Sequence, residues 1–355
     1  MNTQRLRQVG VLAIVAALVA GLAVVGLRWW SDRDRTDLQR AMDLAPGDGE
    51  RFSWTDWDAV RDELGMDLDA DSPSESVTDL MDAAYSADLS STSALPESAQ
   101  VLHVQFGFSP ASADWELFSQ SAAGAVVMLH LPEDTDWERI RSRITNLGFT
   151  EPGEADGIWD GGSDLLGAIG GSITPEVSYI ALDEEESLVL TSDNRGYLVE
   201  ALADATGDGS TVEGLSEVVD ASGSPLSAAI YTGAQACGAL AMGQADPDDQ
   251  AQGEQLAREA GEVNPYTAFA MSVQPGLDLR VALSFENDEQ ARTNADSRAI
   301  LAAGPAPGQG GDFADRFTLG RVEADGRVLT MALEPVEGSY VISDLSNGPV
   351  LFATC

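Results

Sequence analysis

An uncharged apolar run from Val9 to Leu27 restricts the architecture of this chain more than any other feature of its sequence. As a helix, its 19 residues would be roughly 28 Å long, close to the ~30 Å hydrocarbon core of a bilayer. Arginines precede it, and Arg28-Trp29-Trp30 follow, as is typical of a headgroup boundary. The run has no polar face, so a buried helix of a soluble protein does not explain it. The pattern predicts a transmembrane helix.

The competing interpretation of this segment is a cleaved secretory signal. Gly21-Leu22-Ala23 has the small-x-small form of a cleavage site, but the apolar run is longer than a typical signal core. Cleavage there would also leave the apolar sequence VVGLRWW as the new N-terminus. The first cysteine is Cys237, which excludes a lipid-modified N-terminal cysteine. We favour an uncleaved signal-anchor that contacts the lipid bilayer through Val9–Leu27.

Charge predicts the location of the rest and excludes several functions. The chain has 59 acidic residues against 19 arginines, no lysine, and a net charge of −40. Such a surface repels nucleic acid and anionic lipids, and without lysine no Schiff base or P-loop is available. From residue 36 onward, 57 acidic residues face 14 arginines, so positive-inside logic predicts a cytoplasmic N-terminus and an extracytoplasmic bulk. The acidic bias itself also arises in high-GC genomes or salt-tolerant hosts without any functional cause.

The period of the apolar residues predicts an α+β fold. Apolar residues at helical spacing predict helices over residues 53–64 and 75–89, the second with Tyr85 on its apolar face. Alternating patterns predict strands at 101–108 and 124–131, and further strands and helices follow. We therefore expect a single-span protein in five parts: 1–30 as cytoplasmic tip and anchor, 31–50 as a stalk, 51–100 as a helical segment, 101–210 as a first layered α+β lobe and 211–355 as a second.

The order of elements in the second lobe repeats that of the first. Val189-Leu190-Thr191 matches Val328-Leu329-Thr330, and the spacing of Tyr197 and Leu202 matches that of Tyr340 and Leu345. Matches this short arise by chance, so an internal duplication and two unrelated lobes both stay open.

The order "TDW" plus helix, strand pair and "LGF" over residues 51–200 resembles uncharacterised exported, membrane-anchored proteins of high-GC Gram-positive (actinobacterial) bacteria. Those proteins have no assigned activity. The resemblance therefore implies a location at the cell envelope and carries over no catalytic residue.

The stretch GMDLDADSPSES, residues 65–76, is the first candidate site. Asp67, Asp69, Asp71 and Glu75 fall at positions one, three, five and nine of an EF-hand-like calcium loop between two helices. Position six is Ser72 rather than glycine, and position twelve lacks the bidentate glutamate. The alternative, which we favour, is an acidic connector that leads into the next helix.

The two cysteines and two histidines are the next candidates. In an oxidising exterior, Cys237 and Cys355 are expected to form a structural disulfide, with unpaired thiols as the alternative. His103 and His130 would lie on neighbouring strands, where a zinc site needs a further carboxylate. We favour the alternative, two partly exposed strand histidines without a metal. Trp115 and Trp159 have acidic neighbours, as in a sugar platform, but such residues are more often core anchors.

No motif in the sequence names a reaction or a cofactor. The expected role is therefore non-enzymatic: binding, adaptor or structural work at the cell envelope, with an unknown envelope protein or small ligand as partner. Three alternatives remain: a carboxylate-based envelope hydrolase, a calcium-dependent module, and a lipid or small-ligand carrier with an apolar cavity.

Overall fold

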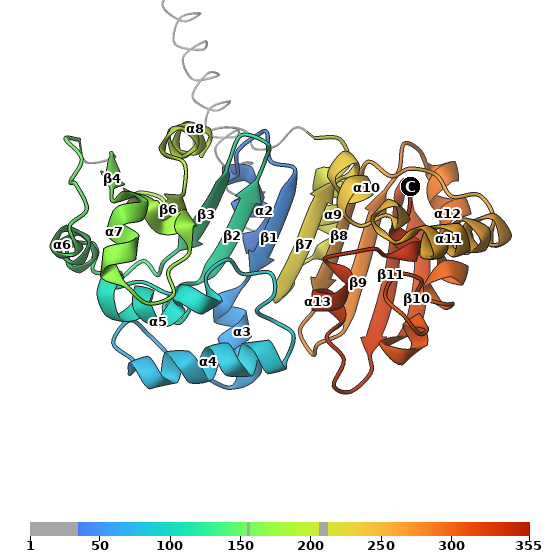
Figure 1. The fold of residues 1–355 in the computed structure, drawn as a ribbon, viewed down its shortest axis with the longest axis horizontal. Coiled ribbons are helices and arrows are strands. Elements are labelled where there is room, and N and C mark those ends of the chain that lie inside the picture. Colours follow the sequence, from blue (N-terminus) through green and yellow to red (C-terminus); the bar gives the residue numbers. More distant parts are fainter. Residues whose placement is uncertain (1–34, 155–156, 206–211) are drawn as a thin grey trace, which may run out of the picture.

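The structure is a computed structural model that describes residues 35–154, 157–205 and 212–355 (Figure 1). The expected anchor Val9–Leu27 and the cytoplasmic tip lie outside the described residues. Within those three ranges, no helix combines the length and apolar character needed to cross a membrane. The mixed α+β class expected from the sequence is confirmed for this part of the chain.

One antiparallel sheet of 11 strands runs through both expected lobes. The strands of the first half are short and mostly buried, and the second half ends in a longer hairpin whose side chains largely alternate between buried and more exposed positions. In order across the sheet they are β10 (Phe317–Asp325), β11 (Val328–Pro335), β9 (Leu279–Ser284), β8 (Ala268–Val273), β7 (Ser227–Thr232), β1 (Arg51–Thr55), β2 (Trp115–Gln120), β3 (Ala125–His130), β6 (Leu188–Ser192), β5 (Tyr179–Asp183) and β4 (Ile158–Asp160).

Strands β1 and β7 join the two halves. They pair antiparallel, with Phe52 opposite Ile230 and Trp54 opposite Ala228. All four of these side chains are buried. The two lobes therefore share one continuous sheet.

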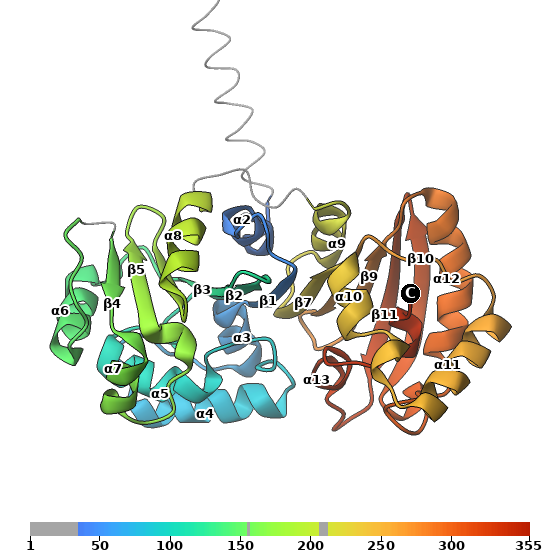
Figure 2. The same ribbon diagram turned by 45° about the horizontal axis from the view of Figure 1, so that its top comes forward.

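Helices cover both faces of the sheet (Figures 1 and 2). One apolar layer, which includes Trp54 and Trp115, packs under three helices: α2 (Asp37–Leu44), α8 (Arg195–Asp204) and α9 (Leu215–Ser222). The larger layer on the opposite face packs under the remaining helices: α3 (Trp57–Leu64), α4 (Ser74–Ser86), α5 (Ala99–Val101), α6 (Trp137–Leu147), α7 (Gly162–Ile169), α10 (Gly233–Ala239), α11 (Pro247–Ala260), α12 (Asp288–Ala302) and α13 (Val341–Leu345).

The two halves repeat the same connection order from the centre of the sheet outward. The first runs β1-β2-β3-β6-β5 and the second β7-β8-β9-β11-β10, with α6 and α12 at equivalent places in the chain. Helices α2 and α9 precede the two central strands and pack into the same layer. The matched Val-Leu-Thr segments lie on the equivalent strands β6 and β11. The matched tyrosine segments lie on α8 and α13, which pack on opposite faces.

Locally encoded helices agree with the sequence prediction. In α6 the Asp136 side chain accepts a hydrogen bond from the Arg139 amide, Ile140 and Ile144 are buried, and Gly148 ends the helix at φ 103°. Helix α3 lies within the helix predicted over residues 53–64; Asp56 caps its start, and Gly65 ends it in the left-handed conformation.

Three expectations were wrong. Residues 101–106, predicted as a strand, continue α5 into a π-helical turn, η2 (Leu102–Phe106). The alternation also fits a helix, because Leu102 and Phe106 are buried four residues apart whereas Val104 is 52% exposed. Residues 51–55, predicted within the helical segment, form β1; its place at the centre of the sheet buries both of its faces, so no alternation marks it.

The third correction concerns the stalk expected at residues 31–50. Residues 37–44 form helix α2, which starts with a capping box between Thr36 and Gln39. Its Leu38, Ala41 and Met42 are buried in the layer that covers β1 and β2. The polar composition of this stretch therefore reflects the exposed side of a packed helix.

Candidate functional site

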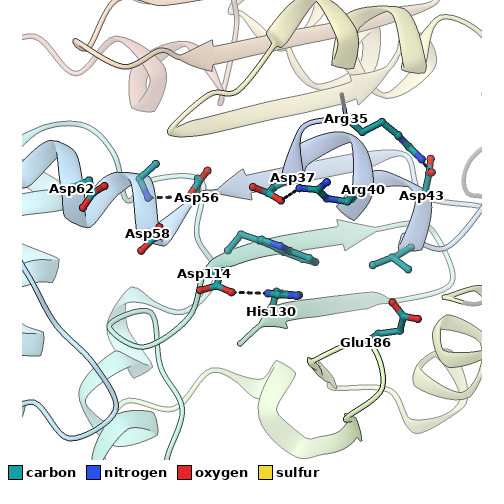
Figure 3. Close-up of a pocket in the computed structure, with 13 residues that line it drawn as sticks. Arg35, Asp37, Arg40, Asp43, Asp56, Asp58, Asp62, Asp114, His130 and Glu186 are labelled. Atoms are coloured by element: carbon teal, nitrogen blue, oxygen red, sulfur yellow. Dashed lines mark hydrogen bonds and ion pairs between the residues drawn. The ribbon is translucent and has the colours of Figure 1, made fainter. Parts of the chain in front are cut away.

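A hollow of about 740 Å³ lies at the edge where α2, the start of α3 and the ends of β2 and β3 meet (Figure 3). We call it the acidic cleft. It is lined by Arg35, Asp37, Arg40, Asp43, Leu44, Asp56, Asp58, Ala59, Asp62, Asp114, Trp115, His130 and Glu186.

Helix α3 is held against this cleft by its first residues. Asp56 caps the helix: its carboxylate accepts a hydrogen bond from the Ala59 amide at 2.9 Å. The amide of Asp56 donates to the Leu226 carbonyl, and the amide of Asp58 donates to the Asp114 carbonyl, both at 2.9 Å. These backbone bonds bring acidic side chains of α3 beside the ends of the strands.

The floor of the cleft is aromatic. Trp115 on β2 lies directly opposite His130 on β3, and their rings stack with centroids 5.1 Å apart and planes 17° apart. Trp54 packs beside Trp115, with ring centroids 5.4 Å apart. The His130 Nδ1 atom lies 2.9 Å from the Asp114 carboxylate, which orients the imidazole. The His130 side chain is 28% exposed, so it can contact a ligand.

Seven carboxylates line the cleft against two arginines. Both arginines are engaged with α2, because Arg35 pairs with Asp43 at 2.5 Å and Arg40 pairs with Asp37. Figure 3 shows these pairs on the side of the cleft opposite Asp62 and Asp58 of α3. The lining therefore carries a net negative charge and favours cationic ligands.

Asp56 is the cleft residue with the most perturbed acidity. Its pKa is raised to about 6, chiefly by burial and also by the neighbouring charges of Asp37 and Asp58, against the lowering effect of the Ala59 hydrogen bond. Its carboxyl group therefore exchanges a proton near neutral pH. In that range it can act as a proton donor or acceptor.

The predicted calcium residues are used differently. The Asp69 carboxylate accepts hydrogen bonds from the Asp71 amide at 2.9 Å and the Ser72 hydroxyl at 3.1 Å; the first of these chiefly lowers its pKa. The Asp71 carboxylate pairs with Arg139 at 2.5 Å, and Glu75 lies in the first turn of α4. Nowhere in the described ranges do three His, Cys, Asp or Glu side chains gather as a metal site. These contacts favour the acidic connector. For Asp67, the only support for a calcium role is its position in the sequence.

The predicted disulfide is present. Cys237 on α10 and Cys355 are bonded, with Cα atoms 5.8 Å apart, and the bridge spans a separation of 118 residues. It ties the last residue of the chain to the layer above β7 and β8.

The histidine pair is not on neighbouring strands. His103 lies in η2 and is 6% exposed; its ring nitrogens contact the Ser109 hydroxyl and the Ser72 carbonyl. The zinc hypothesis required strand neighbours, so this expectation was wrong. Trp159 is 3% exposed and Trp115 5%, as core anchors would be.

Sequence reasoning missed the cleft. Only Trp115 and His130 of its lining were singled out there, each for another reason. Among 59 acidic residues, seven that come from α2, from α3 with its cap and from two further segments carry no common spacing. The one local signal is Asp56, an acidic residue directly before a helical pattern, which marks a cap but not a cleft.

Comparisons with known proteins add little. No protein-family model matches the chain, and no curated protein matches it. Among solved structures, crystal forms I and III of TP0453 are similar at TM-scores of 0.41 and 0.40, with 7% and 6% sequence identity. The likeness covers 88% and 86% of this chain and 97% of the other chain in each case. At these TM-scores it carries no argument about fold or function.

Proposed function

We propose that this chain is a membrane-anchored, extracytoplasmic protein of the cell envelope that binds a partner without catalysis. We further propose that the acidic cleft receives basic side chains of a partner protein. The observation that carries the second proposal is the lining itself, in which seven carboxylates surround a stacked tryptophan and histidine.

Two features support the location. The run Val9–Leu27 has the length and flanks of a single membrane span, and it precedes the described part of the chain. The Cys237–Cys355 disulfide is typical of proteins outside the reducing cytoplasm.

Two chemical features of the cleft favour a lysine- or arginine-bearing partner. Carboxylate oxygens of the lining that are not engaged by Arg35, Arg40 or Arg61 can accept hydrogen bonds from an ammonium or guanidinium group. The exposed part of the stack belongs mainly to His130 and offers a partner an aromatic surface beside these carboxylates. Together they suit a basic side chain better than they suit an anion or an apolar chain.

The alternatives have less support. A carboxylate-based hydrolase is supported only by the raised pKa of Asp56, which by itself names no reaction. The calcium module lacks gathered ligands in the loop, as described above. A lipid carrier needs a large apolar cavity, whereas the hollow that Met42, Leu215 and Val219 line together with five polar or charged residues has a volume of only about 120 Å³.

A charge-matched pair of variants tests the cleft. We expect Asp58→Asn/Asp62→Asn to weaken binding of a hexalysine peptide by about three- to tenfold, because each exposed ion pair contributes ~0.2–1 kcal/mol. The control Asp248→Asn/Asp249→Asn makes the same charge change in the first turn of α11, outside the cleft lining. Isothermal titration of the full-length chain at about 0.15 M salt measures both.

The control variant should change the affinity by less than about twofold, because neither residue lines the cleft and salt screens charges outside it. Equal weakening by both variants would show that the peptide follows only the overall charge of −40. That result, or the absence of binding by the wild-type chain, would end the cleft proposal.

A further inference from the structure

Tyr85 is placed unlike every other aromatic residue that the structure describes. Its side chain is 66% exposed, whereas all remaining aromatic side chains in the described ranges are buried or partly buried. Helical spacing predicts Tyr85 on the apolar face of α4 with Val77, Leu80 and Ala84, and those three are buried. Burial of Tyr85 was therefore the wrong expectation, and its exposed ring needs another explanation.

The exposed ring is held in place from the other half of the molecule. Tyr340, at the start of α13, packs against Tyr85 with ring centroids 5.6 Å apart and planes 37° apart. Figure 2 shows α13 beside the C-terminal end of α4. A tyrosine supported in this way loses little further freedom when a ligand stacks on it.

The Asp88 side chain holds α13, and with it Tyr340, in position next to the end of α4. Its carboxylate accepts hydrogen bonds from the Ile342 amide at 2.8 Å, from the Ser343 amide at 3.3 Å and from the Ser343 hydroxyl. The Asp88 backbone has φ 58°, a left-handed conformation that is uncommon for a residue other than glycine. The bonds across the seam fix α13 relative to α4, and so fix Tyr340 behind Tyr85.

A hollow of about 690 Å³ opens beside Tyr85, where the two halves of the chain meet. We call it the seam groove. Besides Tyr85 it offers two carboxylates, Asp88 and Glu97, and no basic side chain among its lining residues. Six hydroxyl groups also line it: Ser90, Ser91, Ser93, Ser172, Thr174 and Ser343.

We propose that the seam groove is a binding site for a neutral oligosaccharide, with Tyr85 as the stacking platform. The flat apolar face of a sugar ring packs on an aromatic face, while its hydroxyl groups exchange hydrogen bonds with carboxylates and serine or threonine hydroxyls. A volume of about 690 Å³ accommodates two or three sugar rings. An anionic glycan would meet Asp88 and Glu97 with no compensating cation in the lining.

This inference goes beyond the proposed function, because the seam groove and the acidic cleft share no lining residue. Failure at one site therefore leaves the other untouched. The seam groove would bind an uncharged envelope glycan, whereas the acidic cleft would bind basic side chains.

The test uses the full chain in a detergent without a sugar headgroup. Isothermal titration with chitohexaose, cellohexaose and mannohexaose should show binding of at least one of these neutral hexasaccharides. Tyr85→Ala should weaken that binding at least about fivefold, through loss of the stacking surface. Tyr85→Phe should stay within about twofold of the wild type, because the ring remains.

A control removes exposed apolar surface elsewhere. Val199 on α8 is 49% exposed, and Val199→Ala should leave the sugar affinity unchanged. Because Tyr85 is exposed, the alanine variant should fold, and its thermal midpoint can be compared with that of the wild type. Absence of binding to all three sugars, or equal affinity of wild type and Tyr85→Ala, would overturn the proposal.

Discussion

Asp56 combines two roles at the scale of a single residue. It caps α3, and it lines the acidic cleft with a pKa that burial raises to about 6. Its ordinary pKa is 3.8, so the folded chain binds this proton more tightly than the unfolded chain does. The resulting stabilisation is complete below the ordinary pKa and is lost as the pH rises through about 6.

Asp56→Asn should therefore change the pH dependence of stability. Asparagine caps a helix as well as aspartate does, but it carries no charge to be buried. At pH 7 we expect the variant to be more stable than the wild type by on the order of 1–3 kcal/mol, and at pH 3.5 the difference should nearly vanish. Urea unfolding at the two pH values measures the difference.

The control for this prediction is Asp136→Asn. Asp136 caps α6 in the same way, because its side chain accepts a hydrogen bond from the Arg139 amide. It is exposed, however, so its carboxylate keeps more contact with water than that of Asp56. Its effect should be similar at both pH values. A difference between Asp56→Asn and the wild type that is equal at pH 3.5 and pH 7 would contradict the assignment.

At the scale of an element, the turn from α5 into η2 shows that tertiary packing decides whether an alternating apolar segment becomes a strand or a helix. Leu102 and Phe106 are buried, His103 bonds to Ser72 and Ser109, and Gly107 ends the turn at φ 90°. A strand would have put Leu102, Val104 and Phe106 on one face. The helix buries two of the three and leaves Val104 exposed.

Two glycine-to-alanine substitutions should change the free energy of unfolding in opposite directions. Gly107→Ala should destabilise the chain by about 1–2 kcal/mol, because an L-residue is strained at φ 90° and the new Cβ would lie 3.1 Å from Arg143 Cδ. Gly167→Ala, in the middle of α7 with open space around it, should stabilise the chain by about 0.5–1 kcal/mol. Chemical denaturation of both variants measures the free energy of unfolding. A change of the same sign in both variants would contradict the left-handed helix end at Gly107.

At the scale of the whole molecule, a disulfide and a buried arginine hold the C-terminal residues against the second half of the fold. Cys355 is bonded to Cys237 on α10. The fully buried Arg298 donates to the carbonyls of Phe352 at 2.6 Å and Thr354 at 2.9 Å. The last residues thus hold α10, α12 and the sheet of the second half together.

Loss of the disulfide should lower stability. We expect Cys237→Ala/Cys355→Ala to reduce the free energy of unfolding by about 2–5 kcal/mol, because the bridge restricts a long loop of the unfolded chain. A reducing agent should lower the thermal midpoint of the wild type to that of the variant and leave the variant unchanged. A wild-type midpoint that does not respond to complete reduction would contradict this.

Elements whose signals are local could be predicted from the sequence. Helix α6 has its cap, its apolar stripe and its terminal glycine within one segment, and the β5–β6 and β10–β11 hairpins have their turns between adjacent strands. The strand β1 could not, because the centre of the sheet buries both of its faces and removes the alternation. Helix α2 was not predicted either, because its composition is polar and only Leu38, Ala41 and Met42 are buried.

By itself the sequence determined the α+β class, most helices, the pairing of its only two cysteines and the expectation of a membrane anchor. These depend on composition and on patterns within a few residues. Only the tertiary structure decided that both halves share one sheet, that seven carboxylates surround Trp115 and His130, and that Tyr85 stays exposed beside Tyr340. The physical reason is that each of these features joins segments far apart in the chain, whose proximity is set by packing and not by local periodicity.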